Sequence, residues 1–209
     1  MRLRSLQRRP ALAGRPRASI LLTVAVALIA ACLLPASAPA AKQTVTLDFT
    51  ELPSQPVNGV TINGLTFGFT NGDATYNAFG PGSTVFVQDP SLEGSTAGTL
   101  TLSFARPTNR LEFGLALSTF GPLTPGATVA LYNPSGHLRT VVPVNTESLG
   151  SFTEGRFAYS GGAVGSAVIT FNSTFAGRFA LDNLTYEQKG VPRKQVFATS
   201  SGRAASWTR

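Results

Sequence analysis

Apolar and polar residues alternate along short stretches of the chain from position 44 onward, and no stretch repeats with a helical period. Val45, Leu47 and Phe49 alternate with three threonines and Asp48, and residues 100–104 repeat the same two-residue pattern. Asn63-Gly64 between two such runs is typical of a tight hairpin turn. The pattern predicts about ten strands. They are expected near 44–50, 60–62, 65–69, 84–88, 100–104, 111–117, 128–132, 138–144, 156–159, 167–171 and 178–186.

Short strands that follow one another through Gly, Pro and Asn turns favour an antiparallel fold over a parallel α/β fold. We therefore expect a single all-β, antiparallel, jelly-roll-like β-sandwich over residues 43–187. Residues 188–209 carry scattered basic and small polar residues without alternation, which predicts a disordered basic tail.

The first 40 residues have the three-part pattern of a secretory signal peptide. Six arginines precede an apolar run at 20–34, and small residues follow at 36–41. We expect cleavage after Ala40 and export from a bacterial cell, to the medium or the cell surface. A retained anchor is an alternative, although the run is shorter than the roughly 20 residues that span a bilayer. Residues 29–32 resemble a lipobox, so a lipoprotein anchored through Cys32 is a second alternative.

The charge of the predicted domain differs from that of the whole chain. The chain has a formal net charge of +7, but residues 41–186 hold six basic and nine acidic residues. This mildly acidic domain lacks the basic surface that nucleic-acid binding requires, so we expect no nucleic-acid partner. Cys32 is the only cysteine, so a processed domain would contain no disulfide and would depend on its core.

The last predicted strand, residues 178–186, carries one acidic residue among apolar neighbours. Strict alternation would place Asp182 on the same face as Ala180, Leu184 and Tyr186. A carboxylate on such a face costs several kcal/mol, roughly, unless a cation or N–H donors compensate it. The candidates are an arginine (Arg178 or Arg156), turn amides or a metal ion.

Several short motifs carry a resemblance over residues 44–186. They are 47–53 (LDFTELP), 63–67 (NGLTF), 102–107 (LSFARP), 111–113 (LEF) and 179–186 (FALDNLTY). Together they resemble the jelly-roll domains of exported bacterial proteins with PEP-CTERM-like sorting signals and, more distantly, carbohydrate-binding-module sandwiches. The chain ends without a proline-glutamate motif and apolar helix, so we expect no anchoring sorting tail.

The resemblance implies a structural calcium ion between the first and last strands. Its ligands would be Asp182, with Asp48 or Glu51 and main-chain carbonyls. Calcium takes about six to eight oxygen ligands, so three carboxylates alone would not complete the site.

Enzymatic chemistry has little support in the sequence. His137 is the only histidine and follows a hairpin turn, and no Gly-x-Ser-x-Gly motif occurs. One histidine cannot build a zinc site with cysteine ligands in a processed domain. A glycosidase needs only two carboxylates, but no pair stands out. We expect no catalytic residues and keep a carboxylate-dependent glycoside hydrolase as an alternative.

A polar loop with aromatic residues is the best candidate for binding. Aromatic rings next to amides and an acid suit stacking on sugar rings and hydrogen bonding to their hydroxyls. The predicted ligand-binding residues are Asn71, Asp73, Tyr76, Asn77 and Phe79, with Phe120 in a second loop. The alternative is that Tyr76 and Phe79 pack onto the core. We predict a non-catalytic module that binds a glycan or a cell-envelope component, or else a structural or adhesive envelope protein without a small ligand.

Overall fold

A computed structural model describes residues 41–189 of the chain, and this part contains eleven strands and no helix. The strands are β1 (Lys42–Leu47), β2 (Gln55–Pro56), β3 (Thr61–Ile62), β4 (Leu65–Thr70), β5 (Ala74–Ala78), β6 (Ser91–Ser95), β7 (Thr99–Leu117), β8 (Leu123–Tyr132), β9 (Leu138–Ser148), β10 (Thr153–Phe171) and β11 (Arg178–Lys189). All of their pairings are antiparallel. The predicted all-β antiparallel fold is confirmed.

The predicted signal peptide at 1–40, the Cys32 alternative and most of the predicted tail lie outside the described residues. Within 41–189, no helix has the length and hydropathy that crossing a membrane requires.

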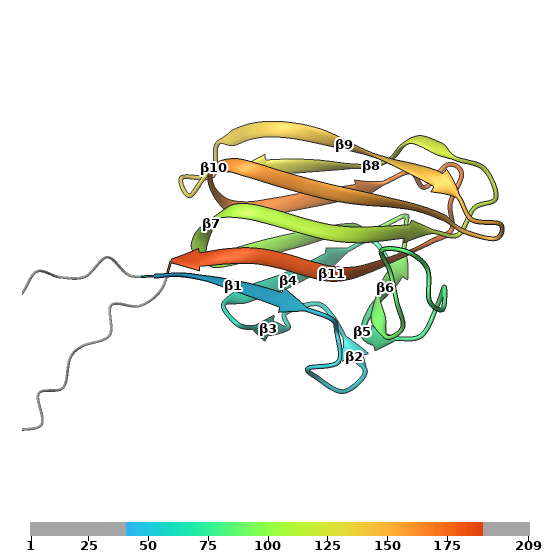
Figure 1. The fold of residues 1–209 in the computed structure, drawn as a ribbon, viewed down its shortest axis with the longest axis horizontal. Helices are drawn as coiled ribbons and strands as arrows, with labels where there is room; N and C mark the ends of the chain where they lie inside the picture. The colour runs from blue at the N-terminus through green and yellow to red at the C-terminus, as the bar shows by residue number, and fades with distance from the viewer. Residues whose placement is uncertain (1–40, 190–209) are drawn as a thin grey trace, which may run out of the picture. The chain divides into compact units, whose positions relative to one another are not determined.

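Two long strands, β7 and β10, connect the two layers of the sandwich. Each has 19 residues, and in Figure 1 each bends at the left and continues in the other layer. The first half of β7 pairs with β4 and with the end of β10, whereas its second half pairs with β11 and the beginning of β10. Register shifts between Ser160 and Ser166 mark the bend in β10. The fold is therefore one continuous hydrogen-bonded sheet folded over on itself.

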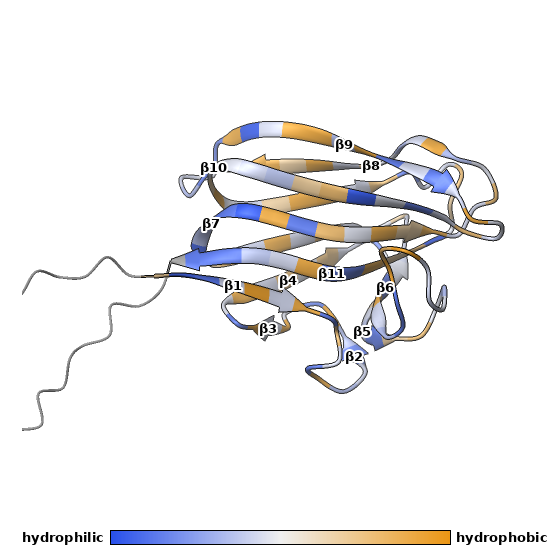
Figure 2. Ribbon diagram, in the orientation of Figure 1, coloured by the Kyte–Doolittle hydropathy of each residue, from blue (hydrophilic) through white to orange (hydrophobic). Residues whose placement is uncertain are grey.

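The core lies between the two layers and is rich in aromatic rings. Phe171 of one layer stacks on Phe179 of the other at 4.0 Å between ring centroids, and Phe104 meets Tyr186 at 5.4 Å. Figure 2 shows hydrophobic and hydrophilic segments alternating along β7, as expected for a strand with one face in the core. Burying each such side chain contributes about 1.5–3 kcal/mol, so this core can stabilise the fold without a disulfide.

Two parts of the predicted strand pattern are wrong. Residues 84–88 are not a strand but part of a loop, residues 79–90, that lies between β5 and β6 and is called the covering loop below. The pattern also missed strands β5 and β6, because the sequence does not alternate clearly in these stretches. Four of the five residues of β6 are buried because both faces of this strand are covered.

The predicted face of Asp182 is also wrong, because β11 contains a β-bulge. The pairing with β7 shifts by one residue between Asp182 and Thr185, and Asn183 has a left-handed φ of 55°. Leu181 and Leu184 therefore both point into the core, and Asp182 points to the outer face of the sheet. The aspartate does not share a face with Leu184 and Tyr186.

Candidate functional site

The covering loop lies over the outer face of β7, β10 and β11, where Gly114, Ala116 and Ala180 leave room for it. Val87 packs on Ala116 and Ala180, separately from the main core. At Gly114 a Cβ atom would lie 2.2 Å from the main-chain oxygen of Phe86. The loop can approach the sheet this closely because position 114 has no side chain.

Glu154 of β10 holds the covering loop through its carboxylate, which is almost fully buried. It accepts main-chain N–H groups of Val85 at 3.0 Å and Val87 at 2.7 Å, and also that of Phe86. The Thr84 hydroxyl donates to the same carboxylate. Hydrogen bonds to a charged acceptor are stronger than those between neutral groups, so this cradle fixes the middle of the loop.

Asp182 of β11 holds the end of the same loop. Its Oδ2 atom accepts the Gln88 N–H at 2.9 Å and the Asn183 side-chain N–H at 3.0 Å, whereas its buried Oδ1 atom has no hydrogen-bond partner. Burial raises the pKa of Asp182 to about 6, although the Gln88 hydrogen bond acts in the opposite direction. A main-chain N–H group of the loop therefore binds this carboxylate. Turn amides were one of the candidate partners that the sequence left open.

The two arginines considered as partners of Asp182 have other acidic partners. Arg178 lies 3.6 Å from Asp73, and Arg156 donates to Glu112 at 2.5 Å. Both guanidinium groups are about half exposed, so they remain accessible from solvent.

The other predicted calcium ligands, Asp48 and Glu51, each have hydrogen-bond partners within the protein. Asp48 accepts the N–H and hydroxyl of Thr50, which lower its pKa. Glu51 accepts the Tyr76 hydroxyl at 2.5 Å and the main-chain N–H of Asp48 at 3.1 Å. In the described part of the chain, no three His, Cys, Asp or Glu side chains gather as a metal site would require. Calcium binding stays a prediction.

A first cleft of about 280 Å³ lies at the beginning of the covering loop. Phe79 and Phe152 are aromatic residues in its lining, and Phe79 is 77% exposed. Arg178 and Glu93 supply the charged groups of the lining. The cleft thus combines a solvent-exposed ring with a guanidinium donor and a carboxyl acceptor.

Glu93 has spare hydrogen-bonding capacity in this first cleft. It is 7% exposed, and the donor assigned to it is the Ser91 hydroxyl at the long distance of 3.5 Å. Burial raises the pKa of Glu93, and Arg178 partly opposes this shift. A ligand hydroxyl can therefore donate a hydrogen bond to this carboxyl group.

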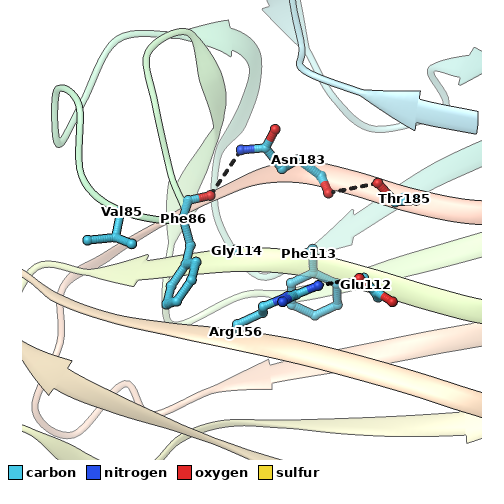
Figure 3. Close-up of a pocket in the computed structure, with 8 residues that line it drawn as sticks. All are labelled: Val85, Phe86, Glu112, Phe113, Gly114, Arg156, Asn183 and Thr185. Carbon is cyan, nitrogen blue, oxygen red and sulfur yellow. Dashed lines mark hydrogen bonds and ion pairs between the residues drawn. The ribbon is translucent and has the colours of Figure 1, made fainter.

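A second cleft, of about 230 Å³, lies at the far side of the loop and is drawn in Figure 3. Its lining includes Phe86, Arg156, Glu112 and Asn183. Figure 3 shows the Phe86 ring next to the Arg156 side chain, and Asn183 donating to the main-chain oxygen of Phe86.

A third, wider cleft of about 650 Å³ joins the other two. It shares Pro81 and Phe152 with the first cleft and Val85 with the second. The three clefts therefore follow one another around the covering loop.

The structure separates the predicted binding residues. Phe79 lines the first cleft, and Asp73 borders it through its ion pair with Arg178. Tyr76 is fully buried against Phe49 and Phe67, so it cannot stack on a ligand in this structure, and the core alternative applies to it.

The remaining predicted residues lie outside the three clefts. Asn77 donates to the Leu52 carbonyl at 2.7 Å, and Asn71 occupies an exposed turn with a φ of 61°. Phe120 is 79% exposed and does not line any of the three clefts. Sequence reasoning missed Glu93, Arg178, Arg156 and Phe86 as cleft residues, because the pattern did not indicate that a loop would cover this face.

Comparisons with known proteins give structural neighbours but no family. No family model and no curated protein matches the chain. Among solved structures, the chain is similar to the family 29 carbohydrate-binding module CBM29_1 from Piromyces equi, with 10% identity, a TM-score of 0.44, and coverage of 72% of this chain and 93% of that one. Another family 29 module has 9% identity and a TM-score of 0.38, with 75% and 99% covered.

A third similar structure is the enzymatically active domain of tailspike protein 4 from bacteriophage CBA120. It has 17% identity and a TM-score of 0.37, and the match covers 62% of this chain and 21% of that one.

Proposed function

We propose that this protein is an exported, non-catalytic β-sandwich module that binds a glycan or another cell-envelope component along the covering loop. The observation that carries the proposal is the first cleft, in which the exposed Phe79 ring lies with Arg178 and Glu93. An aromatic ring can stack on the C–H face of a sugar, while charged groups bind its hydroxyls. Such a cleft suits a neutral, hydroxyl-rich ring.

The proposed role agrees in kind with the family 29 structures, which are carbohydrate-binding modules. The support for the proposal is the set of cleft residues, Phe79, Arg178 and Glu93. Export, and the relation to exported proteins with sorting signals, rest on residues 1–40 and on the sequence motifs.

The test is a glycan array followed by calorimetry with the purified protein. Phe79→Ala should weaken binding of the selected glycan about tenfold, which corresponds to about 1.4 kcal/mol for a stacking contact. Phe175→Ala is the matched control, because Phe175 is 66% exposed and lines none of the three clefts.

Other results of this test would favour the alternatives. A blank array with folded protein would contradict the proposal and favour a structural or adhesive envelope protein. Release of reducing sugar from a bound glycan would favour a carboxylate-dependent hydrolase.

A structural calcium ion is a second part of the proposal. It is supported by the buried Asp182 Oδ1 atom, which lacks a hydrogen-bond partner. Burial is the main cause of the raised pKa of Asp182, and the negative charges of Asp48 and Glu51 add to it. Water and main-chain oxygens would have to supply most of the other ligands. Calcium should raise the melting temperature of the protein but not that of Asp182→Asn. Equal melting temperatures in excess calcium and in chelator would contradict this part.

A further inference from the structure

We infer that the second cleft, between Phe86 and Arg156, binds a carboxylate-bearing sugar unit of the same ligand, so that the glycan is acidic. This inference rests on the proposed function and adds the chemical class of the ligand. It assigns different roles to the two charged clefts on either side of the covering loop.

The charges at the second cleft favour an anion. Glu112 accepts one hydrogen bond from Arg110 Nε at 2.7 Å and one from Arg156 Nη2 at 2.5 Å, so one carboxylate faces two guanidinium groups. These hydrogen bonds, that of Arg110 first, lower the pKa of Glu112 and keep it ionised. Glu112 therefore matches one of the two guanidinium charges, while the neighbouring Glu154 carboxylate is turned to the covering loop, whose N–H groups it accepts.

Arg156 is placed to use its charge on a ligand. Its side chain is 54% exposed, it lines the cleft, and its hydrogen bond to Glu112 uses one of the five N–H donors of a guanidinium group. The planar fork of arginine matches a carboxylate with two parallel hydrogen bonds. The contact with Glu112 fixes the orientation of this fork before a ligand arrives.

Phe86 supplies a stacking surface that is also held in place. Its side chain is 38% exposed, its N–H group is bound by Glu154, and its carbonyl accepts the Asn183 side chain at 3.1 Å. Figure 3 shows this ring beside the Arg156 side chain, whose guanidinium end points to Glu112. A ring beside a guanidinium group suits a six-membered sugar that carries a carboxylate.

The first cleft has a different charge balance. Arg178 lies 3.6 Å from Asp73 and interacts electrostatically with Glu93, so two acidic groups oppose one arginine. A carboxylate is disfavoured there, and a neutral unit is favoured. Because the third cleft connects the two, one glycan chain can place a neutral unit at Phe79 and an acidic unit at Phe86.

The experiment compares oligosaccharides of galacturonate, glucuronate and mannuronate with their carboxyl-reduced, neutral counterparts of equal length. The protein should bind at least one acidic series about tenfold more tightly than its reduced counterpart, and added salt should narrow this difference. Arg156→Gln should abolish the preference for the acidic series. Arg156→Lys should restore part of it, because the charge returns without the fork.

Arg139→Gln is the matched control, since this arginine of β9 is exposed and lines none of the three clefts. Melting temperatures of all variants would show that they are folded. Equal affinity for acidic and reduced oligosaccharides, with Arg156→Gln unchanged, would overturn the acidic subsite, while an effect of Phe79→Ala would still support glycan binding. If no glycan of either kind binds, both the proposed function and this inference are wrong.

Discussion

The two faces of the sheet formed by β7, β10 and β11 are built in opposite ways. On the inner face, Phe113 stacks on Phe157 at 4.8 Å, and both rings are almost fully buried in the core. On the outer face, the same strands carry small residues such as Gly114 and Ala116, and buried carboxylates hold a loop over them. Large apolar side chains stabilise the inner face, whereas a few polar contacts position the outer one.

This difference separates the face that stabilises the fold from the face that is open to solvent. The inner face is covered by the second layer and has no access to ligands. The outer face leaves clefts on either side of the loop because the loop is anchored at Glu154 and Asp182 and covers only part of the strands. Substitutions on the two faces should therefore affect different measurements.

The largest effect is expected on the inner face. Phe113→Ala should lower the free energy of unfolding by about 3–5 kcal/mol, because it removes a buried ring and leaves a cavity beside Phe157. Urea denaturation followed by far-ultraviolet circular dichroism measures this change. A loss below about 1 kcal/mol would mean that the two layers repack, and that the inner face is less fixed than its ring stacking indicates.

On the outer face, Glu154→Gln should cost about 2–3 kcal/mol, because an amide cannot accept the donors of Thr84, Val85 and Val87 as a carboxylate does. Hydrogen exchange at residues 85–87 should accelerate while exchange in the core strands changes little. Glu147 lies opposite Glu154 on β9, is exposed and accepts none of these donors, so Glu147→Gln should leave hydrogen exchange at residues 85–87 unchanged. Uniform acceleration across the domain would contradict the separation of the two faces.

An effect of similar size concerns pH and Asp182. Its pKa is about 6 in the folded protein and near 3.9 in an unfolded chain, so the folded state binds the proton more tightly. The stability gained from this proton is present below about pH 4 and is lost as pH rises through about 6.

Relative to Asp182→Asn, which does not titrate, the protein should therefore lose about 2–3 kcal/mol of stability between pH 4 and 7. Denaturation curves across this range, with the exposed Asp73→Asn as control, measure the difference. A gap between the protein and Asp182→Asn that stays constant with pH would show that the carboxylate is better solvated than its burial indicates.

The two faces also differ in how far the sequence could predict them. Alternation at 100–104 and 111–117 identified the strand segments whose large side chains form the inner face, because burial on one side leaves a period of two. The same pattern misassigned 84–88, because apolar residues in a covering loop and in a strand look alike. Val87 is buried against alanines of the sheet, not within a strand pair.

The candidate site depended on features that alternation does not record. The bulge at Asn183 turned Asp182 to the outer face, and no local pattern distinguishes it from a regular strand. Phe79, predicted as a binding residue from its loop and composition, lines the first cleft, and its role in binding stays a prediction. The pairing of Glu112 with Arg156 joins residues 44 positions apart, so it required the fold.

The smallest effect is expected at the exposed edge, where Lys42 of β1 pairs with Glu187 of β11 at 2.9 Å. The lysine side chain is 64% exposed, so solvent screens the pair and flexibility offsets its attraction. Lys42→Ala should lower the free energy of unfolding by no more than about 0.5 kcal/mol, and salt should remove the difference. A loss comparable to that of Glu154→Gln would mean that this exposed ion pair contributes as much as the buried carboxylate. The pairing of β1 with β11 would then depend on the ion pair. The contrast between buried and exposed charges on this side of the sheet would then be wrong.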